Sequence, residues 1–119
     1  MRQRTVIIYN ITFLAFLFFV IAFFFALVYM VLDFLEIGRV IDHYASIRHQ
    51  EKPIDHFTSS LYFSFITLFS VGYGDMTPFG LSKGVAIIEA TIGHVIPIAI
   101  VIKYILFTPR SIMNAIRKD

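Results

Sequence analysis

The chain has 119 residues, of which 58% are hydrophobic and only 15% are charged. Soluble domains average about 45–50% apolar and about 25% charged residues, so this composition indicates one small membrane domain. The absence of cysteine excludes a disulfide framework and a thiolate metal site. The basic residues lie mainly near the chain ends without an aromatic–basic groove pattern, so the net charge of +2 does not predict a nucleic-acid partner.

The first predicted element is a membrane-spanning helix over residues 6–32. These 27 residues carry no charge. A helix of that length measures about 40 Å, which is enough to cross about 30 Å of hydrocarbon with some tilt. Arg2 and Arg4 precede it, as in a signal peptide, but the apolar run is too long for one and no clear cleavage site follows.

The next segment, 33–54, is polar and is predicted to lie outside the membrane. Between positions 33 and 56, five acidic residues face three basic ones, whereas basic residues mark both chain ends: Arg2, Arg4, Lys103, Arg110, Arg117 and Lys118. The positive-inside rule therefore places both termini in the cytoplasm, with the chain in the cell membrane. Termini on one side require an even number of crossings.

Residues 57–73, "FTSSLYFSFITLFSVGY", would add a third crossing and break that parity. The segment is short for a span and rich in Ser and Thr. Pro53 precedes it, and Asp55 can cap a helix start. We therefore predict a short helix over 55–69 that enters the membrane and turns back. Non-helical backbone at membrane depth must be buried in protein or line a water-filled path.

The return segment contains "SVGYG", residues 70–74. Gly72 and Gly74 can take positive φ at little cost. Alternating the sign of φ along a strand points successive carbonyl oxygens to the same side, where they can replace the water around a cation. One chain cannot surround an ion, so several copies are expected to converge.

A second span is predicted over residues 83–108. Its apolar run, 84–108, carries Glu89, His94 and Lys103, and charged residues inside a span normally face protein or water. Pro97 predicts a kink, because proline removes a helical hydrogen bond. A short cytoplasmic tail, 109–119, follows.

The stretch "TLFSVGYGDMTP" resembles the signature of the potassium channels, in which four T-V-G-Y-G loops form rings of carbonyls. The two-span layout resembles the small bacterial and archaeal-type members with two transmembrane helices. The resemblance implies an all-α membrane protein that assembles as a tetramer. Its parts would be an outer helix, an extracellular turret, a pore helix, a selectivity filter, an inner helix and a tail, at 6–32, 33–54, 55–69, 70–74, 83–108 and 109–119.

The same resemblance assigns roles to the filter. Its ion ligands would be the Ser70 hydroxyl and the carbonyls of Ser70, Val71, Gly72 and Tyr73, with Gly74 at the mouth. Serine stands where the family usually has threonine, so the innermost ion site is expected to be looser. Filter support is assigned to three residues: Tyr62, Thr67 and Asp75, with the Tyr62 hydroxyl donating to Asp75.

Two features of filter support differ from the family. Phe63 offers no polar atom to Tyr73, and Ile66 replaces a buried glutamate that some members carry.

For gating, the resemblance places a hinge at Gly93, with Pro97 one turn later; close helix packing is the alternative reading of Gly93. His94 is a candidate pH-sensing or cavity residue, or else a neutral histidine bonded to a neighbour. Glu89 is expected behind the filter, against the pore helix.

The expected function is a homotetrameric, potassium-selective channel in a lipid bilayer, with K⁺ as the permeant bound ion and no other cofactor. A weakly selective cation channel is the nearer alternative, because of Ser70 and the altered support of Tyr73. A non-conducting accessory membrane subunit is the other. An enzyme is not expected, since no nucleophile–base pair or metal-ligand cluster is visible.

Overall fold

The computed structural model describes residues 2–50, 52–107, 114 and 117. Apart from positions 114 and 117, the predicted tail lies outside the described residues. The described chain is mostly helical, and its elements follow in this order: α1 (Arg2–Phe34), β1 (Gly38–Asp42), α2 (Ile47–Gln50), α3 (Pro53–Leu68), β2 (Met76–Gly80) and α4 (Leu81–Phe107).

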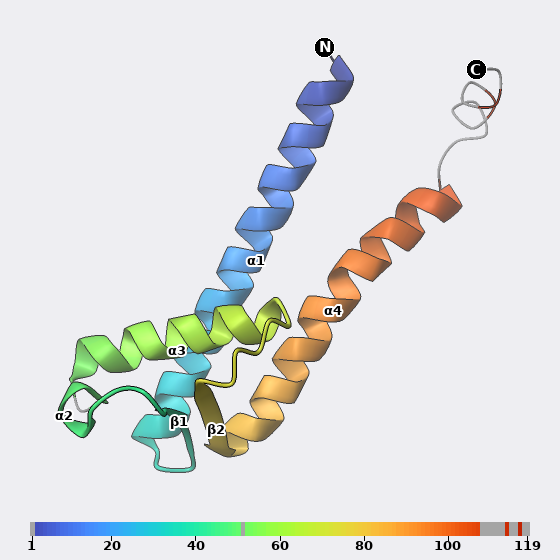
Figure 1. Ribbon diagram of the computed structural model, residues 1–119. Helices are drawn as coiled ribbons and strands as arrows, with labels where there is room; N and C mark the ends of the chain where they lie inside the picture. The colour runs from blue at the N-terminus through green and yellow to red at the C-terminus, as the bar shows by residue number, and fades with distance from the viewer. Residues whose placement is uncertain (1, 51, 108–113, 115–116, 118–119) are drawn as a thin grey trace.

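Helices α1 and α4 run side by side and diverge toward the end at which α1 begins and α4 finishes (Figure 1). Among the described helices these two are long and apolar enough to cross a membrane, over Arg2–Phe34 and Leu81–Lys103. Their most apolar stretches are only 22% and 11% buried within the chain. Core helices of a soluble protein would be largely covered, so this exposure favours a lipid or protein environment outside the single chain.

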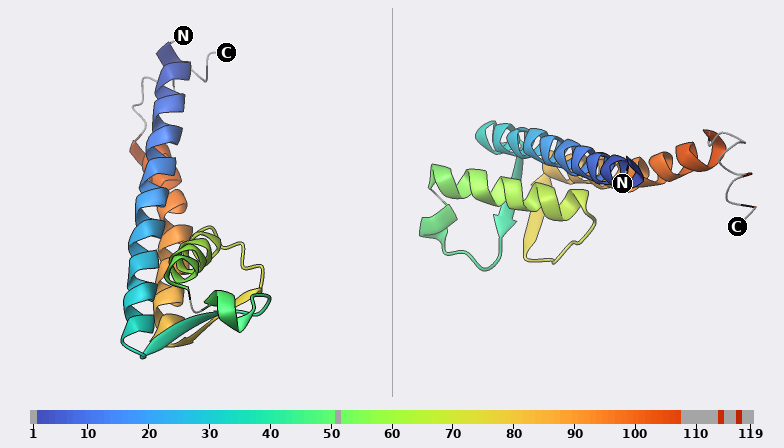
Figure 2. Two further views of the ribbon diagram at one scale, coloured as in Figure 1. Left: turned by 90° about the vertical axis from the view of Figure 1, so that its left-hand side faces the viewer. Right: turned by 90° about the horizontal axis from the view of Figure 1, so that it is seen from above.

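Helix α3 lies against one face of the layer formed by α1 and α4 (Figure 2). It begins at Pro53, where the missing amide hydrogen costs nothing because the first helical N–H groups have no intrahelical partner. Asp55 lies in the first turn and Lys52 occupies the N-cap position. The Asp55 carboxylate therefore interacts favourably with the positive, N-terminal end of the helix dipole from within the first turn. It is not the capping residue.

Two clusters join α3 to α1. Tyr29 and Phe63 pack edge to face at 5.1 Å between ring centroids, beside Phe25, Ile66 and Met76.

The second cluster comprises Phe18, Ala22 and Leu68, all buried. Small residues on α1 let α3 approach closely at that point.

The fold is not all-α, because a strand of the predicted turret pairs with the segment after the candidate filter in a two-stranded antiparallel sheet. Strand β1 pairs with β2 in a register that matches Gly38 with Gly80 and Asp42 with Met76. Gly80 has φ +62°, and a β carbon there would stand 2.5 Å from the Ile37 carbonyl oxygen. The sheet ties the end of α1 to the start of α4, so the predicted turret is in part a strand.

Candidate ion-filter site

The candidate filter leaves the C-terminal end of α3 as an irregular segment. Positive φ angles occur at every second residue: +56° at Ser70, +54° at Gly72 and +81° at Gly74. Val71 and Tyr73 are not among the positive-φ residues. The sign of φ therefore alternates through residues 70–74, and two of the three left-handed positions are glycines, which adopt them without strain.

Backbone hydrogen bonds fix the direction of the first filter peptides. The N–H groups of Val71 and Gly72 both donate to the carbonyl oxygen of Ile66, at 2.9 and 3.3 Å. The peptide bonds of the described residues are trans, and in a planar trans peptide the N–H and the preceding C=O point in opposite directions. The carbonyl oxygens of Ser70 and Val71 therefore point away from α3, toward the same side.

Thr67 contributes through its main chain, because its carbonyl oxygen accepts the Ser70 N–H at 3.1 Å. Sequence reasoning named Thr67 as a support but missed Ile66 as an acceptor, since a carbonyl leaves no trace in residue type. The Ile66 side chain is buried in the core. Its apolar side chain fixes the last turn of α3 while its carbonyl holds the filter.

The side chains of the candidate filter are uncovered in the single chain. Val71 is 51% exposed and Tyr73 is 71% exposed. Nothing lies within 4 Å of the position where a β carbon would stand at Gly72 or Gly74. In the single chain the segment thus contacts α3 through its backbone and leaves the Val71 and Tyr73 side chains exposed.

The C-terminal end of the candidate filter is attached to the sheet. The N–H of His43 donates to the Asp75 carbonyl oxygen at 2.9 Å, and the His43 Nε2 lies 2.6 Å from the Thr77 hydroxyl. His43 was not predicted as a support; only the pairing of β1 with β2 brings it there. Strand β1 and the adjoining His43 therefore hold both ends of the link 75–80 between the candidate filter and α4.

The Tyr62 and Asp75 side chains lie near each other. Among the described residues their contact is not a well-formed hydrogen bond. Partial burial, and then the neighbouring Asp75 carboxyl, raise the pKa of the Tyr62 hydroxyl. Asp75 Oδ1 is buried without a hydrogen-bond partner in the described chain. The two side chains are close enough for Asp75 to affect Tyr62. The predicted hydrogen bond from Tyr62 to Asp75 remains a prediction.

Gly93 of α4 sits directly on the end of α3. A β carbon at Gly93 would stand 1.9 Å from the Leu68 carbonyl oxygen, which is far inside contact distance. Gly93 therefore has a close-packing role, the alternative that the sequence left open beside a hinge. Ser70, Gly93, His94 and Pro97 line one apolar hollow of about 540 Å³, whose opposite wall is α1.

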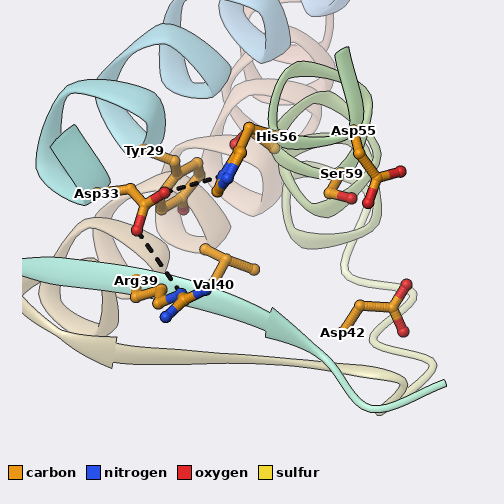
Figure 3. A pocket seen from close by; sticks show the side chains of 9 residues that line it. Tyr29, Asp33, Arg39, Val40, Asp42, Asp55, His56 and Ser59 are labelled. Atoms are coloured by element: carbon orange, nitrogen blue, oxygen red, sulfur yellow. Dashed lines mark ion pairs between the residues drawn. The ribbon is translucent and has the colours of Figure 1, made fainter. Parts of the chain in front are cut away.

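Near the C-terminal end of α1, Asp33 joins three elements (Figure 3). It accepts from His56 Nδ1 of α3 at 2.9 Å and lies 3.8 Å from Arg39 Nε of β1. Asp42 and Asp55 border the same small pocket. No group of three or more His, Asp or Glu among the described residues is arranged to hold a metal ion, so this pocket is an ion-pair junction.

Glu89 contacts α3, as the sequence predicted. Its side chain is fully buried and interacts with Ser64 and with Tyr29. Lys103 and His94 are exposed in the single chain. Of these three titratable residues of α4, Glu89 is the one that is buried against α1 and α3.

Comparisons with known proteins agree with this architecture. Protein LctB of Bacillus caldotenax is 38% identical over 77 residues, covering 65% of this chain and 56% of its own. Protein LctB of Geobacillus stearothermophilus is 47% identical over 51 residues, covering 43% and 38%. The chain thus matches about half or less of the length of these relatives. No solved structure shows a significant match.

A family model described as "Ion channel" matches residues 4–108, which include most of α1, the candidate filter and all of α4. The family includes small channels with two transmembrane helices. The match and the two apolar helices together establish that this chain belongs to that ion channel family.

Proposed function

We propose that the protein is a potassium-selective channel, in which four copies place residues 70–74 around one axis. The observation that carries the proposal is the hydrogen bonding of the Val71 and Gly72 amides to Ile66, which turns the Ser70 and Val71 carbonyls away from α3. Alternating φ through Gly74 supports the same orientation further along. Rings of such carbonyls can replace the hydration shell of K⁺.

Assembly of several copies is supported by what the single chain leaves uncovered. Val71 and Tyr73 are exposed although they flank the proposed ion path. One strand of carbonyls cannot complete a shell around an ion. A tetramer would cover these side chains with neighbouring copies and close the ring, and the hollow beside Ser70 would face the assembly or the lipid.

The proposed orientation places the termini in the cytoplasm of the cell. The start of α1 and the end of α4 lie at one end of the molecule, and α3 with both strands lies toward the other (Figure 1). Arg2 and Arg4 mark the first end. In this orientation the C-terminal carbonyls of α3 would point into the membrane. The helix dipole places about half a negative charge at that end of each copy of α3, which would favour a cation below the filter.

The test is rubidium uptake into liposomes that contain the purified protein, with native mass measurement of the assembly. We expect a tetramer whose uptake is blocked far better by potassium than by sodium. Equal competition by sodium would favour the weakly selective channel. No uptake by an intact tetramer would favour an accessory subunit, and a dimer or trimer would contradict the proposal.

A matched pair of variants locates the ion path. Gly74→Ala should abolish selective uptake, because alanine resists φ of +81°. Gly84→Ala adds the same methyl group to α4, where nothing lies within 4 Å, and should conduct as the parent does. Unaltered selectivity in Gly74→Ala would place the filter elsewhere.

A further inference from the structure

One buried acidic group lies outside the proposed ion path. Glu89 of α4 is 0% exposed. The Tyr29 hydroxyl of α1 donates to its Oε2 at 2.6 Å, and the Ser64 hydroxyl of α3 is in hydrogen-bond contact with its Oε1. Ser64 Oγ also lies 2.6 Å from the Ala22 carbonyl oxygen of α1. Glu89 thus stands where all three long helices meet.

The number of protons in this group of contacts is decisive. A serine hydroxyl has one proton to donate, yet Ser64 Oγ touches two oxygens, and the Ala22 carbonyl can only accept. With an ionised carboxylate, one of the two contacts would bring together oxygens with no proton between them. With a protonated carboxyl, Glu89 donates to Ser64, Ser64 donates to Ala22, and Tyr29 donates to Glu89, so every contact carries one proton.

Among the described residues, no cationic side chain forms an ion pair with Glu89. Tyr29 is the titratable group facing Glu89 from α1, α3 contributes the Ser64 hydroxyl, and Met76 of β2 adds to the apolar cluster around Tyr29. The ion pairs of the described residues involve Asp33, at the outer end. Burying an unpaired carboxylate is strongly unfavourable, so a neutral carboxyl is the stable form.

We propose that Glu89 is a protonated carboxylic acid that joins α1, α3 and α4 and positions α3, with the filter support that α3 carries. Ser64 lies two residues before Ile66, whose carbonyl holds the Val71 and Gly72 amides. Displacement of α3 at Ser64 would therefore displace the acceptor of the filter amides. This positioning role rests on the proposed function; the protonation of Glu89 does not.

Infrared spectroscopy tests the protonation directly. At neutral pH, where ordinary Asp and Glu side chains are ionised, the parent should show the carbonyl stretching band of a protonated carboxylic acid. Glu89→Gln should lose that band. Tyr29→Phe should keep it but shift it to higher frequency, because the hydrogen bond to Oε2 is lost. No band in the parent, or a band unchanged in both variants, overturns the proposal.

The second measurement is rescue by the conservative variant. In Glu89→Gln the amide group can donate to Ser64 and accept from Tyr29, so tetramer yield and melting temperature should match the parent. Glu89→Ala should lower both. Equal losses in the Gln and Ala variants would show that a charge is required. Neither readout depends on conduction, so a failure of the channel proposal would leave them interpretable.

Flux then tests positioning. Glu89→Gln should retain the parent's preference for potassium over sodium, whereas Ser64→Ala should reduce it by loosening α3. If Ser64→Ala forms a stable tetramer with unaltered preference, Glu89 does not act through α3.

Discussion

Gly93 lies against the carbonyl oxygen of Leu68 so closely that a β carbon on Gly93 would stand 1.9 Å from that oxygen. This contact joins the middle of α4 to the last turn of α3, at the base of the candidate filter. Any motion of α4 at Gly93 must therefore preserve the contact or disturb the end of α3. A hinge at this glycine, if it operates, is coupled to the filter base by packing.

Gly93→Ala should destabilise the protein by about 1–3 kcal/mol, because the added methyl group must displace backbone and cannot simply push aside a flexible side chain. Gly84→Ala is the matched control within the same helix. It meets open space, and alanine is favoured over glycine in a helix by about 0.5–1 kcal/mol. Thermal unfolding in detergent should therefore give shifts of opposite sign. Equal shifts would contradict the close packing.

Tyr62 should make stability depend on alkaline pH. Its pKa in the folded chain is raised above the ordinary value of 10.0, by partial burial and then by Asp75. Its contribution is therefore fully present below pH 10.0 and is lost as the pH rises through the folded-state pKa. The unfolding free energy of the parent should fall more steeply in that range than that of Tyr62→Phe.

Tyr44→Phe is the control for this experiment, because Tyr44 is 87% exposed. Curves of unfolding free energy against pH that run parallel for Tyr62→Phe and Tyr44→Phe would show that Tyr62 has no special environment. A second consequence is functional: Tyr62→Phe and Asp75→Asn should make the proposed filter lose conduction faster over time than the parent.

The contact between His43 and Thr77 should hold the turret strand against the filter exit. A double-mutant cycle with His43→Ala and Thr77→Val should give a coupling energy of about 0.5–1.5 kcal/mol, the usual net worth of a hydrogen bond. The backbone bond from His43 to Asp75 survives in both variants, so the cycle isolates the side chains. A coupling energy of zero would mean that the imidazole adds nothing to the sheet.

The orientation can be tested by introduced cysteines, because the chain has none of its own. Gln3→Cys lies at the proposed cytoplasmic end, and Ser46→Cys lies in the proposed outer segment; both positions are exposed. A membrane-impermeant maleimide added to intact cells should label Ser46→Cys and leave Gln3→Cys unlabelled until the cells are opened. The reverse pattern would invert the topology.

Several features could be predicted from sequence because they depend on local properties. The apolar runs that became α1 and α4 are defined by length and hydropathy alone. Gly72 and Gly74 indicated backbone with positive φ, because glycine is the residue that accepts it without strain. The role of Ser70 in ion binding remains a prediction, although its positive φ continues the alternation.

Tertiary structure decided the features that depend on residues far apart in the chain. Strand β1 has little apolar alternation of its own, and only pairing with β2 makes it a strand and brings His43 to Asp75. Gly93 reads as a hinge or a packing glycine until Leu68 is placed against it. Glu89 reads as a charge until Tyr29, Ser64 and Ala22 surround it, because a proton count requires every partner to be in place.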